Sequence, residues 1–166
     1  MFQPLDLEKL TFSPFRTIGK RWMLISAGDR EHYNTMTASW GGVGVLWNKN
    51  VAMIYLRPQR YTKEFIEANE RFTLSFFDEN ERSALQFCGS HSGRDCDKAK
   101  ETGLVPTTLD GSVTFFQAKM VFVCQKLYKQ DFLPDGFLDT SLVEKNYPNR
   151  DFHTMYVAEI LSVYAQ

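Results

Sequence analysis

The segment NTMTASWGGVGVLW, residues 34–47, ends like a β-strand but carries glycine and other small residues in its middle. Glycine weakens a strand because it loses the most conformational entropy on folding and has no side chain to pack. Two explanations account for its use here. Either a flat ligand lies against the backbone, whose N–H and C=O groups contact its polar edges, or the sheet bends at a barrel corner, which also needs glycine.

The segments around residues 34–47 predict a sheet with helices packed outside it. The turn NKN between residues 36–47 and 51–58 predicts a hairpin, which Pro58 ends. Strands that are mostly adjacent in sequence favour a mainly β, antiparallel fold with peripheral helices. The expected strands are 21–28, 36–47, 51–58, 71–78, 113–128 (one strand, or two joined by a bulge) and 155–165.

Three short helices are expected over residues 61–70, 78–89 and 95–103. Side-chain oxygens favour helix N-caps, and glycine favours helix C-termini. The expected caps are Thr62, Asp78 with Glu81 in a capping box, and Asp95, with Gly89 and Gly103 at the C-terminal ends. The polar residues 129–151 are expected to form a long loop with one helical turn.

The segment RPQRYTKEFIEANE, residues 57–70, places two arginines between the end of a strand and the start of a helix. Guanidinium groups match phosphate oxygens, and helix N-termini favour anions. Arg57, Arg60, Thr62 and backbone amides are therefore predicted to hold a phosphomonoester. In the alternative, both arginines are solvated or form ion pairs with Glu64 and Glu67.

A second polar segment, GSHSGRDCDK at residues 89–98, gathers hydroxyl and cationic donors before an expected helix. These donors could hold an anion, although the same composition suits a solvated loop. They are Ser90, Ser92, Arg94 and Lys98. A zinc site at Cys88, His91 and Cys96 is disfavoured, because the spacing lacks a second pair of ligands.

His153 lies just before the last expected strand, among aromatic residues. It is either a site residue or a loop histidine without a role. The chain has 3 histidines and no recognisable serine or cysteine nucleophile constellation, so hydrolysis by a catalytic triad is not expected.

The composition limits the class of protein. The chain has 166 residues, 43% of them hydrophobic, which suits one domain with a substantial core. A net charge of −1 argues against a nucleic-acid partner, because that affinity comes mainly from neutralised phosphates. The sequence has no run of about 18 apolar residues, so no membrane-spanning helix is predicted. Three cysteines without an export signal predict a reducing, cytoplasmic location.

Four segments, in this order and spacing, resemble one known family. They are NTMTASWGG, RPQRYTKEFIEANERFTLSFF, GSHSGRDCDKAKETGL and DFHTMYVAEI. Together they resemble the flavin reductase-like, FMN-binding split-barrel family, and most closely its flavoredoxin-like subgroup, over about residues 15–163. Each segment alone is a weak signal, but the combination of TMTASWGG, RPQRYT and SGRDCDK is specific.

The resemblance implies a six-stranded antiparallel split β-barrel of Greek-key type, in one domain spanning residues 1–166. It also implies a homodimer, one non-covalent FMN per subunit, and hydride transfer from NADH or NADPH to the flavin. In a flavoredoxin-like alternative, a redox partner protein supplies the electrons and NAD(P)H is not turned over. In a third alternative, the same barrel binds haem or another flat, phosphate-bearing ligand.

The resemblance also assigns site residues. The flavin ring and ribityl chain would face the strand residues Asn34, Met36, Thr37, Ala38, Ser39 and Trp40. The phosphate would lie among Arg57, Arg60, Tyr61 and Thr62. The other side of the flavin would be closed by Ser90, Ser92, Gly93 and Lys98, and His153 would lie on the nicotinamide side. The chain departs from the family at Ala158, where glycine is frequent and allows a tighter strand contact.

Overall fold

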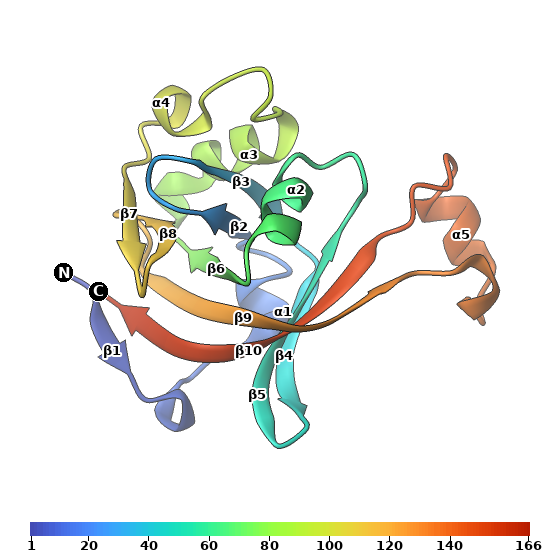
Figure 1. The fold of residues 1–166 in the computed structure, drawn as a ribbon, viewed down its shortest axis with the longest axis horizontal. Helices are drawn as coiled ribbons and strands as arrows, with labels where there is room; N and C mark the ends of the chain where they lie inside the picture. Colours follow the sequence, from blue (N-terminus) through green and yellow to red (C-terminus); the bar gives the residue numbers. More distant parts are fainter.

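The computed structural model describes all 166 residues and shows a mainly β fold with short peripheral helices (Figure 1). This confirms the expected class. The strands are β1 Gln3–Leu5, β2 Met23–Gly28, β3 Tyr33–Ala38, β4 Gly41–Leu46, β5 Lys49–Leu56, β6 Arg71–Phe76, β7 Pro106–Leu109, β8 Ser112–Phe115, β9 Met120–Asp131 and β10 Thr154–Ala165. The helices are α1 Pro14–Thr17, α2 Thr62–Ala68, α3 Arg82–Ser90, α4 Lys98–Thr102 and α5 Ser141–Asn146, with 3-10 turns η1 Leu7–Lys9, η2 Glu79–Glu81 and η3 Pro134–Gly136.

One curved antiparallel sheet forms the body of the molecule, in the order β3-β2-β6-β9-β10-β5-β4, and β1 pairs with the end of β10. The consecutive strands β5 and β6 are not neighbours in this sheet, which is the crossing connection of a Greek-key arrangement. The long strand β10 shifts register against β9 between Val157 and Ala158 and between Ile160 and Ser162. Such bulges increase twist and help a sheet to curl. Ala158 fits between the neighbouring strands opposite Ala52, fully buried.

The expected single strand at residues 36–47 is wrong, because the structure has two strands there. β3 and β4 lie at opposite edges of the sheet and are joined through Ser39 and Trp40. At the crossing, a Cβ on Gly41 would lie 3.0 Å from the carbonyl oxygen of Met53 and 3.1 Å from the Met23 side chain. The barrel-corner explanation therefore accounts for Gly41, since a side chain there would push the two parts of the chain apart.

The expected hairpin is confirmed between β4 and β5, and its turn residues Trp47 and Asn48 have φ angles of 53° and 56°. Two consecutive positive φ angles are typical of the tight turns that match strand twist. The expected strand 113–128 divides into β8 and β9, which belong to different sheets, so no bulge joins them. The first residues of the expected loop 129–151 continue β9, and the rest contains η3 and α5.

The three expected helices are present, but their predicted N-caps are wrong. Tyr61 is the N-cap of α2. Thr62 is the first residue of the helix, and its side chain accepts a hydrogen bond from Asn34. Asp78 makes no capping hydrogen bond, because the 3-10 turn η2 separates it from α3. Asp97, not Asp95, caps α4 by accepting from the Lys100 amide. The left-handed C-cap at Gly103 is confirmed, whereas α3 continues past Gly89 to Ser90.

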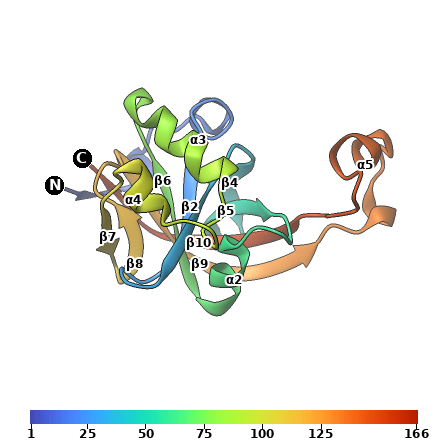
Figure 2. The ribbon, with the colours of Figure 1, turned by 90° about the horizontal axis from the view of Figure 1, so that it is seen from above.

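The core consists of two clusters, one inside the curved sheet and one between the sheet and the α3, α4 and β8 layer. Strand β2 separates them: Ile25 packs into the first cluster and Leu24 into the second. Because β2 is buried on both faces, its neighbour β3 is held firmly as one wall of the barrel. In Figure 2, α3 and α4 lie over this side of the sheet.

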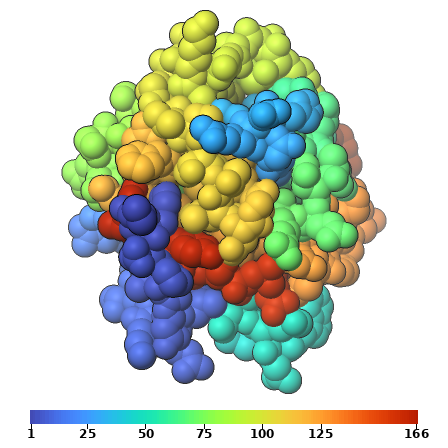
Figure 3. Space-filling model, turned by 60° about the vertical axis from the view of Figure 1, so that its left-hand side comes forward, coloured from blue at the N-terminus to red at the C-terminus, as the bar shows by residue number.

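The two termini and the α5 segment lie at opposite ends of the molecule. The N-terminal strand β1 pairs with the last residues of β10, and in Figure 3 the blue N-terminal segment lies beside the red C-terminal strand. At the other end, the segment between β9 and β10, which carries α5, extends away from the sheet (Figures 1 and 2). The last residues of that segment lead back to the barrel at β10.

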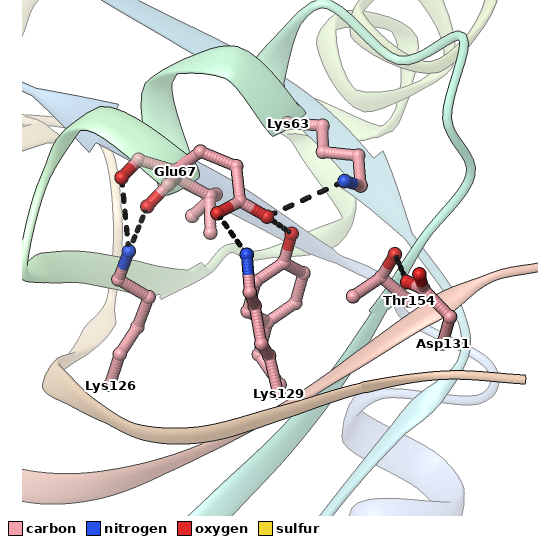
Figure 4. Close-up of polar contacts among 8 residues, drawn as sticks. Lys63, Glu67, Lys126, Lys129, Asp131 and Thr154 are labelled. Carbon is pink, nitrogen blue, oxygen red and sulfur yellow. Dashed lines mark hydrogen bonds and ion pairs between the residues drawn. The ribbon is translucent and has the colours of Figure 1, made fainter.

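Helix α2 is fastened to the sheet at its C-terminal end by Glu67 (Figure 4). The Glu67 carboxylate accepts hydrogen bonds from Tyr156 at 2.5 Å and from Lys129 at 2.8 Å. Lys126 donates to the backbone oxygen of Ile66 at 2.5 Å, which places a cation at the negative end of the helix dipole. These contacts from β9 and β10 fix α2, and therefore the chain that leads into it.

We expect Glu67→Gln to destabilise the protein at neutral pH by roughly 1–2 kcal/mol, since about a third of the side chain is exposed and solvent screens the charge. Burial raises the pKa of Glu67, but the bonds and charges of Lys129, Tyr156 and Lys63 outweigh it and lower the pKa to about 2. Because the folded-state pKa is below the ordinary 4.5, the stabilisation is complete above about pH 4.5 and is lost as the pH falls towards 2. Urea unfolding at pH 7 and pH 3 measures this difference.

The control is Glu70→Gln, a nearby exposed carboxylate that forms no ion pair. An equal loss of stability in the two variants, or a Glu67→Gln effect that does not shrink in acid, would contradict the assigned role.

Candidate functional site

Strand β3 lines two cavities, one at each end. The smaller has a volume of about 170 Å³ and is lined by Met36, Thr37, Ala38, Ser39, Trp40, Tyr55, Arg57, Arg60 and His153. The larger, of about 420 Å³, is lined by residues that include Asn34, Gly93 and Lys98. Most of the residues predicted from the sequence are thus brought together along β3. The small residues Ala38 and Ser39 both line the smaller cavity.

Arg57 is held by the protein rather than left free for a ligand. Its guanidinium donates to Asp151 Oδ2 at 2.6 Å and to the backbone oxygen of Asn146 at 2.7 Å. Its Cζ also lies 5.0 Å from the ring centroid of Tyr147. Asp151 is a partner that the sequence analysis missed, although it stands two residues before His153. Its carboxylate offsets much of the charge that Arg57 brings to the cavity.

Arg60 is half-buried and has no carboxylate partner. The only hydrogen bond of its guanidinium goes to the backbone oxygen of Gly89, at 2.8 Å. Burial lowers its pKa, and the nearby charge of Arg57 lowers it further. The expected alternative pairing with Glu64 or Glu67 is not found, because Glu64 pairs with Arg94 and Glu67 with lysines. Arg60 therefore contributes an uncompensated positive charge to the smaller cavity.

Thr62 connects the first turn of α2 to β3. Its Oγ1 accepts a hydrogen bond of 2.8 Å from Asn34 Nδ2, and both side chains are buried. The hydroxyl thereby orients the amide of Asn34, but Thr62 is 1% exposed and lines neither cavity. α2 has 7 residues, too few for its N-terminus alone to define an anion site.

Lys98 is a second buried cation without an acidic partner. It is 6% exposed, and its Nζ donates to the backbone oxygens of Thr35 and Cys88, each at 2.8 Å. Burial lowers its pKa, because the charged form is desolvated. A lysine ammonium has three protons, and two carbonyls occupy two of them. The third has no partner in the protein, and Lys98 lines the larger cavity.

The other predicted site residues of the 89–98 segment do not all line the two cavities. Ser90 donates to Gln86 at the end of α3 and lines neither cavity, and Ser92 accepts from the Arg94 amide. Gly93 packs against Asn34 so closely that a Cβ would lie 1.9 Å from Asn34 Oδ1. Tyr61 also lies outside both cavities, under the guanidinium of Arg94 at 4.5 Å.

His153 is buried and lines the smaller cavity. Burial lowers its pKa to about 4, with further lowering by Arg57 and Arg60, so the imidazole is neutral near pH 7. Its ring lies 5.4 Å from that of Trp40, and its Nδ1 lies 2.7 Å from the hydroxyl of Tyr147. Tyr147 was not among the residues predicted for the site, although it lies in the same aromatic segment of the sequence as His153.

No group of three or more histidine, cysteine, aspartate or glutamate side chains is placed to hold a metal ion. The cysteines are free thiols, two of them, Cys88 and Cys124, buried. None of the helices has the length and apolar character needed to cross a membrane.

Comparison with family models matches residues 15–166 to the flavin reductase like domain. Among solved structures, the chain is similar to an FMN-binding domain of a flavin reductases-like enzyme from Shewanella baltica, with a TM-score of 0.71 and 18% identity over 99% of this chain and 77% of that one. It is also similar to the flavoredoxin of Methanosarcina acetivorans, with a TM-score of 0.69 and 18% identity over 88% and 68%.

A third similar structure is the styrene monooxygenase flavin reductase of Pseudomonas putida, with a TM-score of 0.63 and 17% identity over 87% of this chain and 78% of that one. No curated protein sequence matches the chain. At these identities the structural likeness establishes the fold, and the family model establishes the relationship.

Proposed function

The chain belongs to the flavin reductase-like domain family, and on that premise we propose that it binds FMN without a covalent bond and transfers hydride to it from NADH or NADPH. Bound FMN supplies the acceptor for the hydride, since the cofactor carries this chemistry and the protein supplies position and charge.

The observation that carries the proposal is the pair of partly or fully buried cations, Arg60 and Lys98, which line the cavities at the two ends of β3. Neither side chain forms an ion pair in the structure. A buried charge without a partner is costly, so a site that keeps two of them is suited to an anionic ligand. FMN has a phosphate dianion at one end, and its ring carries negative charge when reduced. The residues present therefore fit the cofactor that the family suggests.

In this proposal, β3 supports the flat part of the cofactor and Arg60 holds its phosphate, while Thr62 fixes the amide of Asn34 and its direct contact with the phosphate stays a prediction. Lys98 stabilises negative charge at the other end of β3. Direct contact between Arg57 and the phosphate stays a prediction, and the ion pair with Asp151 gives Arg57 a second role in fixing the wall around His153. His153, being neutral, orients the reactants and does not deliver a proton from an imidazolium near pH 7.

We also propose a homodimer, as the resemblance implied. The β4–β5 hairpin supports it, because the edge strand β4 exposes Val45 and Leu46 and the turn after it exposes Trp47. Exposed apolar patches on edge strands are typical of surfaces that pair with another chain.

A flavoredoxin-like electron carrier is the second candidate, and the size of the cavity beside His153 favours it. Its volume of about 170 Å³ is below the roughly 300–1,000 Å³ of ordinary ligand sites. A cavity of that size, once it holds part of a flavin, leaves little room for a nicotinamide ring in one subunit.

Anaerobic mixing of the FMN-loaded protein with NADH or NADPH separates the two candidates. We expect the visible absorbance of the flavin to bleach rapidly with one of the two nucleotides, because stacking the reactants removes the entropy cost of bringing them together. Free FMN at the same concentration is the control. A bound flavin that neither nucleotide reduces, but that dithionite does, would contradict the reductase and favour the carrier.

A further inference from the structure

His153 has one nitrogen bound by the protein and one left for a ligand. Nδ1 lies 2.7 Å from the hydroxyl oxygen of Tyr147, and both residues are buried, at 6% and 5% exposure. Nε2 makes no hydrogen bond to the protein. Asp151 Oδ1 is the only fully buried side-chain polar atom that lacks a hydrogen bond, so the unpaired Nε2 is not fully buried. Because His153 lines the smaller cavity, Nε2 is the ring nitrogen that a ligand there can reach.

The direction of the hydrogen bond between Tyr147 and His153 follows from counting protons and acceptors. The phenol of Tyr147 has one proton and no other hydrogen-bond acceptor in the structure. If His153 donated from Nδ1, the buried phenol proton would be left without a partner, which is unfavourable. The hydroxyl therefore donates to Nδ1, and the neutral imidazole carries its proton on Nε2.

Tyr147 is itself firmly held. The guanidinium of Arg57 lies over its ring at 5.0 Å, and Arg57 is fixed in turn by Asp151. The Tyr147 ring also packs near that of Phe152, with centroids 4.9 Å apart. The Tyr147 backbone amide also donates to the backbone oxygen of Val143 and so caps the C-terminus of α5, which ties the support of His153 to that helix.

We propose that Tyr147 is a positioning residue that holds His153 as the Nε2–H tautomer, so that the cavity presents a neutral N–H donor to an amide-type carbonyl oxygen of its ligand. The inference rests on the proposed function for the identity of that carbonyl, which belongs either to the nicotinamide carboxamide or to the flavin ring. The tautomer of His153 does not depend on the proposed function, because it is set by residues of the chain alone.

The tautomer is tested by nitrogen-15 NMR of the full chain labelled at histidine, without ligand, at pH 7. Comparison with His153→Gln assigns the signals of His153 among the 3 histidines. We expect an unprotonated Nδ1 and a protonated Nε2. In Tyr147→Phe, which keeps the aromatic ring, we expect a mixture of tautomers and a higher pKa of His153, because the neutral form loses its donor.

Tyr164→Phe is the matched control, since it removes a hydroxyl that bonds Asp110 at 2.8 Å, far along β10 from His153. It is expected to leave the His153 signals unchanged. A protonated Nδ1 in the parent protein, or His153 signals that are the same in Tyr147→Phe and the parent, would overturn the proposal.

The ligand is tested by two constants measured on the same variant. If the carbonyl belongs to nicotinamide, Tyr147→Phe raises the KM for the reduced nucleotide about tenfold and leaves the Kd for FMN unchanged. If it belongs to the flavin, the Kd for FMN rises about tenfold instead. Tenfold is the effect of one ordinary hydrogen bond. A variant that changes neither constant overturns the carbonyl assignment. If no nucleotide is turned over, the NMR and FMN measurements still decide the proposal.

Discussion

Replacing Arg60 with alanine is expected to weaken FMN binding about 10- to 150-fold, which corresponds to the roughly 1.5–3 kcal/mol of a hydrogen bond to a charged group. The guanidinium is half-buried, has no carboxylate partner and lines the cavity at the end of β3. A phosphate would complete the charge balance that the protein itself leaves open. Titration of the apo-protein with FMN, followed by quenching of flavin fluorescence, measures the change in Kd.

Two variants separate the role of Arg60 from a general loss of positive charge. Arg60→Lys keeps the charge but not the forked donors, so we expect an intermediate loss of affinity. Arg71→Ala removes an exposed arginine at the start of β6, where its side chain reaches only the backbone of Asp110. It is expected to bind FMN as the parent does. Equal FMN affinity in Arg60→Ala and the parent would remove Arg60 from the site.

Replacing Gly93 with alanine is expected to weaken FMN binding at least tenfold and to lower stability by roughly 1–3 kcal/mol, the usual range for overpacking. The new methyl group would lie 1.9 Å from Asn34 Oδ1. Asn34 cannot turn aside without breaking its bond to Thr62. Either this amide or the 91–95 segment must therefore move, and both border the larger cavity. FMN titration and urea unfolding of the same preparation measure the two effects.

Gly136→Ala is the control for Gly93→Ala, because nothing lies within 4 Å of a Cβ at that position in η3. It should change neither FMN affinity nor stability measurably. If Gly93→Ala behaved in the same way, the close packing of the 89–98 segment on β3 would have no part in holding the cofactor.

The cationic donors of residues 57–62 could be predicted from the sequence, but the hydrogen-bond partners of the two arginines could not. Proline at position 58, two arginines and a helix-forming segment identify a strand end beside cationic donors, whatever the rest of the chain does. Asp151, which neutralises Arg57, is 94 residues away, and Gly89, which accepts from Arg60, is 29 residues away. Spacing along the chain does not encode such contacts, because they form only when β5, α3 and β10 are assembled.

Residues 34–47 show the same division. Their small side chains predicted that something lies close to the backbone, and the sequence left open whether this is a ligand or another part of the sheet. In the structure, Gly41 lies where the chain passes from β3 to β4, close to Met53 and Met23, and residues 36–40 line the smaller cavity. β3 ends at Ala38 and β4 begins at Gly41, although the sequence between them carries no proline or turn motif, so the closure of the barrel decides where one strand ends and the next begins.

The sequence by itself determined the class of fold, the β4–β5 hairpin and the cationic and small-residue segments, because these depend on periodicity, turn chemistry and composition over a few neighbouring residues. The tertiary structure alone decided which cations remain without a counter-charge, and that Tyr147 directs the proton of His153 into the cavity. Those properties depend on burial and on partners from distant strands, and both exist only once the chain is packed.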